Sequence, residues 1–153
     1  MELYTTKDAP FKIPAWEGQP DFYRADLQFH GVEHRGDSYE GRVFLGTTDV
    51  SPQTPTELES GYAGSFYVFG HGPCFGDEGH CDVEAGPPIH HYDYRRPHPL
   101  NTQRMTVTIT KALRRTVEAG ASAVEVTVIP TNAHNEEVGD ILHFKRLSLV
   151  TYD

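Results

Sequence analysis

Apolar and polar residues alternate over several short stretches of this chain, which is the pattern of half-buried β-strands. In residues 25–32, Leu27 and Phe29 fall on one side of an extended chain, and Asp26 and Gln28 fall on the other. Stretches with the same kind of alternation occupy residues 38–47, 104–110, 122–130 and 140–152. The chain is therefore predicted to be rich in β-structure.

Residues 64–72 carry a different pattern, because both faces of the predicted strand are apolar. Phe66 and Val68 alternate with Tyr67 and Phe69. This pattern predicts a central strand that is packed on two sides, with Phe66 and Phe69 in the core.

One helix is expected, over residues 111–120, because Gly120 supplies a stop signal at its end. Several strands with one short helix indicate an all-β fold, an antiparallel β-sandwich or barrel. Three prolines in residues 1–20 predict an extended N-terminal arm, and residues 21–153 are predicted to form a single domain.

Residues 72–103 form a long connection without periodicity, rich in histidine, cysteine, glycine and proline. Loops of this length inside a compact domain are uncommon and usually functional. The candidate metal ligands at its start are two imidazoles and two thiols, His71, Cys74, His80 and Cys81. Such donors suit copper or zinc. The spacing is not that of paired C-x2-C zinc units, so a Cys74–Cys81 disulfide or two inert thiols remain open alternatives.

Further histidines lie along the same loop and near the first strand. His90, His91 and His98 are a possible secondary metal cluster, although neighbouring residues of an extended chain point to opposite sides. A solvated polar loop is the alternative for them. His30 and His34 are interpreted as surface residues, since they flank a strand end and a turn.

Two aromatic residues, Phe75 in the loop and Tyr62 before the apolar strand, are candidates for a partner-facing surface.

The charge of the chain limits its partners. Thirteen Lys and Arg residues against 22 Asp and Glu give a formal net charge of −9, which disfavours nucleic acid and anionic membranes. The sequence has no apolar run that predicts a membrane span, and its first residues do not resemble a signal peptide, so a cytoplasmic protein, or a domain cut from a larger one, is expected.

The order of the motifs "ADLQFHGVEHRGDSYEGRVFL", "GYAGSFYVFGHGPCFGDEGHCDV", "RRPHPLNTQRMTVTITKALR" and "LHFKRLSLVTYD" resembles the β-rich domain that follows the copper-binding domain in long bacterial tyrosinases. More distantly, the chain resembles the β-sandwich of mollusc haemocyanin and plant polyphenol oxidase. The resemblance covers residues 21–153. It implies a domain that shields an oxidase active site.

A tyrosinase holds two copper ions, each by three histidines that lie mostly on a helical bundle. This sequence has one short predicted helix without such histidines, so no catalytic residue is carried over. The predicted function is a non-catalytic metal-binding β-domain, copper being favoured, whose partner is a tyrosinase-type oxidase or a second copy of this chain. A mononuclear metal enzyme acting on a phenol-like molecule, and a purely structural domain with a Cys74–Cys81 disulfide, remain alternatives.

Overall fold

The structure is a computed structural model, which describes residues 3–13, 20–72, 91–92, 100–136 and 138–153. Its described strands are β1 (Tyr4–Thr5), β2 (Phe11–Lys12), β3 (Arg24–Val32), β4 (Tyr39–Leu45), β5 (Tyr62–Val68), β6 (Gln103–Thr108), β7 (Ala123–Val124), β8 (Val126–Thr131) and β9 (Arg146–Tyr152). The 3-10 helix η1 (Leu58–Ser60) precedes β5, and the α-helix α1 (Thr110–Glu118) follows β6.

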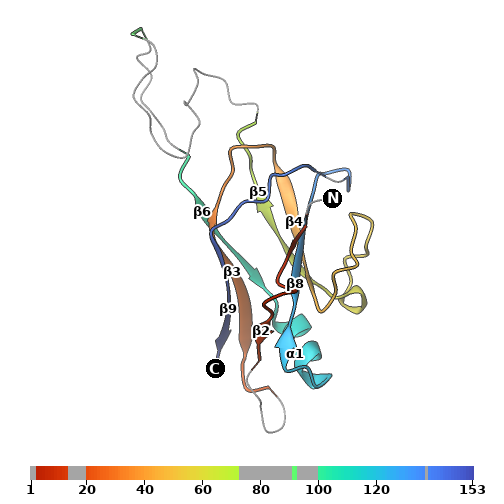
Figure 1. The fold of residues 1–153 in the computed structure, drawn as a ribbon. Helices are drawn as coiled ribbons and strands as arrows, with labels where there is room; N and C mark the ends of the chain where they lie inside the picture. Colours follow the sequence, from red (N-terminus) through yellow and green to blue (C-terminus); the bar gives the residue numbers. More distant parts are fainter. Residues whose placement is uncertain (1–2, 14–19, 73–90, 93–99, 137) are drawn as a thin grey trace.

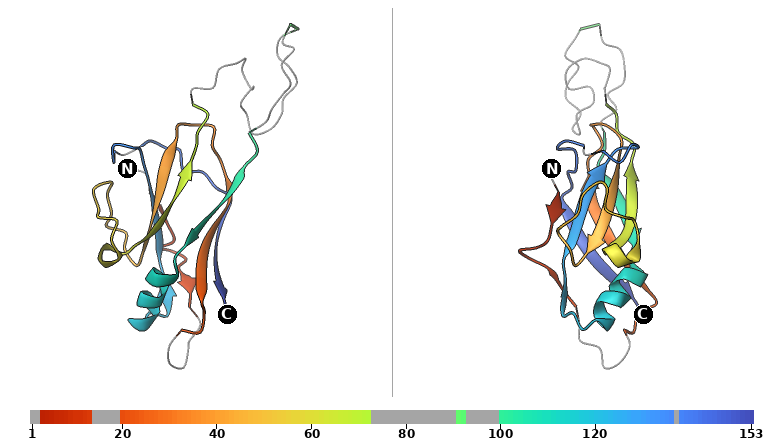
Figure 2. Two further views of the ribbon diagram at one scale, coloured as in Figure 1. Left: turned by 180° about the vertical axis from the view of Figure 1, so that it is seen from behind. Right: turned by 90° about the vertical axis from the view of Figure 1, so that its right-hand side faces the viewer.

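The strands form two main antiparallel sheets that face one another (Figure 1). The first sheet has the order β1-β8-β4-β5, the second has the order β6-β3-β9, and β2 and β7 form a separate short pair. The helix α1 lies near one end of the sandwich, and the start of β6 lies at the other end (Figures 1 and 2). Because neither sheet closes on itself in the described residues, the predicted all-β antiparallel fold is confirmed as a sandwich rather than a barrel.

The hydrophobic core fills the space between the two sheets. On β3, Leu27 and Phe29 are fully buried and face inward, as the alternation predicts. The ring centroid of Phe29 lies 4.6 Å from that of Phe66 on β5 and 5.2 Å from that of Phe144, just before β9. These three rings therefore join the second sheet to the first and to the C-terminal segment.

The prediction of a doubly buried strand over residues 64–72 is wrong. The strand β5 ends at Val68 and lies at the edge of the first sheet. Phe66 and Val68 are buried, but Tyr67 is 62% exposed and Phe69 is 81% exposed. Tyr67 lies on the uncovered face of this edge strand and Phe69 follows its end, so both aromatic side chains are in solvent.

The strands buried on both faces are instead β4 and β8, in the middle of the first sheet. Their outer face carries Phe44 and Ile129, which pack with Val50 and Tyr62 into a second, smaller core. The covering side chain, Val50, comes from the polar connection between β4 and β5, where the sequence pattern gives little sign of burial.

Several predicted boundaries shift in the structure. The strand expected over residues 122–130 is divided at Glu125, whose carbonyl oxygen accepts a hydrogen bond from the Gly46 N–H at 2.9 Å. The strand expected over residues 140–152 begins only at Arg146.

The predicted helix is present as α1, and Gly120 follows its end with a positive φ of 84°. Its N–H donates to the carbonyl oxygen of Val117 at 2.8 Å, which closes the helix. Among the described residues, no helix is long and apolar enough to cross a membrane.

Part of the N-terminal arm joins the sheets. β1 pairs with β8, with Tyr4 opposite Val128, and β2 pairs with β7, with Phe11 opposite Val124. Ile13 is buried in the main core. Residues 4–13 thus contribute to both the sheet edge and the core.

A buried carboxylate lies on the outer face of the second sheet. Asp26 is 1% exposed, and its Oδ1 accepts hydrogen bonds from Arg24 Nε and Thr108 Oγ1, each at 2.9 Å. The second carboxylate oxygen is 2.8 Å from Arg24 Nη2. Burial alone raises the pKa of Asp26, but the bonds from Arg24 and Thr108 and the charge of Arg24 outweigh it, so the pKa is lowered.

Acid is therefore expected to destabilise this face of the sandwich. A carboxyl with a lowered folded-state pKa stabilises the fold above its unfolded-state value of about 3.9, and this contribution is lost as the pH falls through the folded-state value. Asp26→Asn is expected to lower the free energy of unfolding at pH 7 by about 1–3 kcal/mol and to flatten its decline below pH ~4. Urea unfolding over this pH range measures both effects. The control is Asp49→Asn, at an exposed carboxyl, and an unchanged acid slope in Asp26→Asn would contradict the assignment.

Candidate functional site

Two histidines meet at the end of the sandwich opposite α1. His34 follows β3, and His71 follows β5. Their Nδ1 atoms are 3.2 Å apart, and their ring centroids are 5.0 Å apart. His34 is 8% exposed, whereas His71 is exposed. The ring of His34 is therefore buried in the protein, and the ring of His71 faces solvent.

The backbone fixes this pair in place. The N–H of His71 donates to the carbonyl oxygen of His34 at 3.0 Å, and the N–H of Gly72 donates to that of Gly36 at 2.9 Å. The side chain of His34 reaches a third segment, because its Nε2 lies 2.9 Å from the carbonyl oxygen of Asn101. His34 thus contacts both the segment that ends at Gly72 and the segment that begins at Leu100.

The interpretation of His34 as a surface residue is wrong. The alternation that ends at β3 gives no signal for burial at position 34. The segment after β3 is covered because it pairs with the segment after β5 and contacts Asn101, and these contacts join residues far apart in the sequence.

Most of the ligands predicted from the sequence lie outside the described residues. Only His71 of the first cluster and His91 of the second are placed. The ligands outside are Cys74, His80, Cys81, His90 and His98, and the predicted partner-facing residue Phe75 also lies outside the described residues. His91 is exposed in a turn, with its ring centroid 5.0 Å from that of Tyr92.

Tyr62, a predicted partner-facing residue, is partly buried. Its ring packs against Phe44, with ring centroids 5.7 Å apart, and its hydroxyl lies 2.7 Å from Ser65 Oγ. The same residue lines a surface hollow of about 370 Å³ together with Leu58 and the start of α1. A contact with a partner at this position stays a prediction.

His30 lies apart from His34, on the outer face of the second sheet. In the strand register it stands between Arg104 on β6 and Arg146 on β9. Desolvation and the charges of Arg146 and Arg104 lower the pKa of His30. The two histidines of the "HGVEH" segment therefore occupy different environments.

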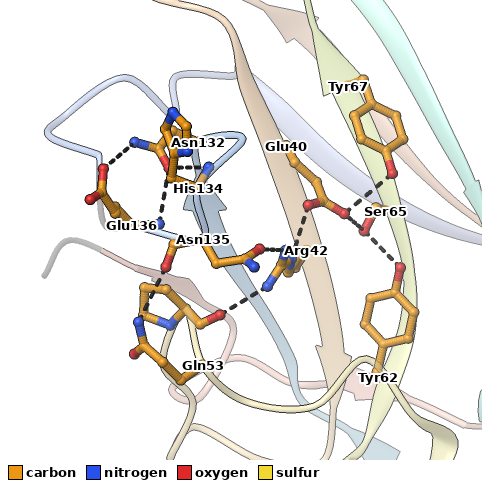
Figure 3. A network of polar contacts seen from close by, with 11 residues as sticks. Glu40, Arg42, Gln53, Tyr62, Ser65, Tyr67, Asn132, His134, Asn135 and Glu136 are labelled. Atoms are coloured by element: carbon orange, nitrogen blue, oxygen red, sulfur yellow. Dashed lines mark hydrogen bonds and ion pairs between the residues drawn. The ribbon is translucent and has the colours of Figure 1, made fainter.

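A second polar cluster covers the outer face of the first sheet (Figure 3). The buried guanidinium of Arg42 donates to Glu40 Oε2 at 3.0 Å, to the carbonyl oxygen of Pro52 at 2.9 Å, and to Asn135 Oδ1. Because Pro52 and Asn135 belong to two different connections, Arg42 holds both of them against the sheet. Because Arg42 alternates with Tyr39 and Gly41 along β4, the sequence could have predicted that Arg42 lies on this outer face. The sequence gives no comparable sign of its partners Pro52 and Asn135.

The same cluster extends to the exposed edge strand β5. Glu40 Oε1 accepts hydrogen bonds from Ser65 Oγ at 2.7 Å and from the Tyr67 hydroxyl at 3.3 Å. The nearby charge of Glu40 is the main reason that the pKa of Tyr67 is raised. Since Glu40 also bonds to Arg42, the cluster is a set of mutually satisfied groups. Its geometry fits a structural clamp.

Comparison with known proteins gives matches only among solved structures. No protein-family profile matches the sequence, and no curated protein matches it. A structure of recombinantly expressed latent aurone synthase (polyphenol oxidase), co-crystallised with hexatungstotellurate(VI), matches with a TM-score of 0.54 and 16% identity over 99% of this chain. A second structure of recombinantly expressed latent aurone synthase matches with a TM-score of 0.53 and 16% identity over 98%.

Each match covers only 24% of the aurone synthase chain. At this identity the likeness concerns the fold alone. The fold of this chain is therefore one that a segment of about a quarter of the polyphenol oxidase chain adopts, and the predicted resemblance to the polyphenol oxidase β-sandwich is confirmed at the level of the fold.

Proposed function

We propose that this chain is a non-catalytic β-domain that accompanies a tyrosinase-type oxidase and binds a metal ion at the end of its sandwich. The observation that carries the first part is the extent of the structural match. It takes in 99% of this chain and 24% of a polyphenol oxidase chain, so nearly all of the given chain has the fold of one segment of that larger oxidase. A domain that folds beside an oxidase can shield its active site or serve it.

The metal-binding part of the proposal rests on the donor set. His71 is exposed and held at the end of the sandwich, and Cys74, His80 and Cys81 follow it within ten residues. Two imidazoles and two thiolates suit Cu(I) and Zn(II). The described residues contain no group of three or more His, Cys, Asp and Glu side chains that could hold a metal ion. A site with three or more of these ligands therefore needs at least one donor from outside the described residues, and residues 73–90, which carry both cysteines, are the segment proposed here.

Metal loading tests this proposal. The purified protein is expected to bind about one equivalent of Zn(II) or Cu(I), and the double variant Cys74→Ser, Cys81→Ser is expected to lose tight binding because hydroxyls are poor ligands for these ions. Equal stoichiometry and affinity in both proteins would remove the cysteines from the site.

Mass spectrometry without reduction provides the matching control on the state of the thiols. A mass lower by two hydrogens in the native protein, absent in the double variant, would favour the structural alternative with a Cys74–Cys81 disulfide. The native mass with both thiols free is the result that the proposal requires of the metal-free protein.

A further inference from the structure

We propose that His34 and His71 bind the metal ion together through their Nδ1 atoms, so that His34 is a ligand that the sequence motif omits. The proposal deepens the proposed function, on which it rests for the presence of a metal at His71. Its own warrant is the geometry of the two rings.

The tautomer of His34 leaves the correct nitrogen available. Nε2 of His34 lies 2.9 Å from the carbonyl oxygen of Asn101, and a carbonyl oxygen only accepts hydrogen bonds. The Nε2 atom therefore carries the hydrogen, and in the neutral ring Nδ1 has a free lone pair. Histidine ligands commonly donate the other ring N–H to a backbone carbonyl or a carboxylate in this way. The contact with Asn101 also fixes the ring orientation.

The separation of the two Nδ1 atoms fits a shared ion. Zinc binds imidazole nitrogen at about 2.0–2.1 Å, and at a tetrahedral angle two such nitrogens are about 3.3 Å apart. The observed Nδ1–Nδ1 distance is 3.2 Å. A cation placed between the rings thus requires little movement of either side chain. In the metal-free protein, Nδ1 of His71 carries a hydrogen and donates it to Nδ1 of His34. When the ion binds, the hydrogen of His71 moves to Nε2 of the same ring.

The protein holds these two nitrogens before any ion arrives. The N–H of His71 donates to the carbonyl oxygen of His34 at 3.0 Å, so the backbones of the two ligands are joined directly. Since His34 is 8% exposed, its ring has little freedom. His71 is exposed, which leaves one side of the pair open to incoming ions and to further ligands. Prepositioned ligands of this kind raise affinity because little ordering is needed on binding.

Zinc titration of single variants tests the role of His34. His34→Gln retains an amide N–H for Asn101 but supplies no imidazole, and it is expected to weaken Zn(II) binding by more than the factor of about 10–100 that the loss of an outer-shell partner costs. The matched control is His30→Gln, on the outer face of the second sheet, for which unchanged affinity is expected. Circular dichroism of each variant reports whether the fold is retained, and His71→Gln, at an exposed position, gives a second test if His34→Gln fails to fold.

The outcomes separate this inference from the proposed function. Tight binding in the native protein that survives both His34→Gln and His71→Gln would overturn the inference and leave the cysteine ligands standing. Binding that survives Cys74→Ser with Cys81→Ser but is lost in His34→Gln would support the inference and remove the cysteines. A shift of the His34 Nδ1 resonance in nitrogen NMR on addition of Zn(II) supports direct ligation, and an unchanged resonance in the zinc-bound protein overturns it.

Discussion

Replacing Phe29 by alanine is expected to lower the free energy of unfolding by about 3–5 kcal/mol, the range for removing a fully buried phenylalanine. Phe29 is 0% exposed, and its ring contacts those of Phe66 and Phe144. The substitution therefore opens a cavity where the two sheets and the C-terminal segment meet. Urea unfolding followed by circular dichroism measures the loss.

A matched control is available in the same residue type. Phe69 is 81% exposed, so Phe69→Ala is expected to change the free energy of unfolding by less than about 0.5 kcal/mol. Similar losses in the two variants would contradict the assignment of Phe29 to the core and of Phe69 to the surface.

Replacing Gly70 by alanine is expected to destabilise the protein by about 1–3 kcal/mol and to weaken metal binding together with it. A Cβ at this position would lie 2.0 Å from the carbonyl oxygen of Gly36 and 2.4 Å from the carbonyl carbon of Asp37. These are backbone atoms, so the segments after β3 and after β5 must move apart. The neighbouring hydrogen bond from the His71 N–H to the His34 carbonyl oxygen would then be lengthened or lost.

Gly139→Ala is the control for this substitution, because a Cβ there meets no atom within 4 Å. It is expected to leave both the free energy of unfolding and the zinc affinity unchanged. If Gly70→Ala matched Gly139→Ala in both the free energy of unfolding and the zinc affinity, the close approach of Gly70 to Gly36 and Asp37 would be contradicted.

The sequence was sufficient to predict the strands that obey simple alternation. In β3, Leu27 and Phe29 face the core and Asp26 faces outward, because one face of that strand packs on the first sheet and the other does not. The end of α1 was predictable for a local reason as well, since Gly120 adopts a conformation that favours glycine.

The errors lie where burial depends on contacts between distant segments. Residues 64–72 looked like a strand buried on both faces, but β5 ends at Val68 and lies at the edge of its sheet, and edge position is a property of the sheet order rather than of the strand. Phe44 and Ile129 are buried on the outer face because Val50, from a connection, covers them.

The candidate site shows the same limit. The sequence named His71 as a candidate ligand because it lies beside cysteines and glycines, and that assignment stays a prediction. His34 was not, because its burial depends on Asn101, 67 residues further along the chain. A histidine at a strand end gives no local sign that a distant carbonyl will fix its tautomer.

Elemental analysis of the protein as isolated, without added metal, tests the central claim most directly. The account predicts about one equivalent of copper or zinc per chain, and a large decrease in that content for the variant Cys74→Ser, Cys81→Ser and for His34→Gln. A native protein that contains no metal, and that takes up none when copper or zinc is supplied, would contradict it.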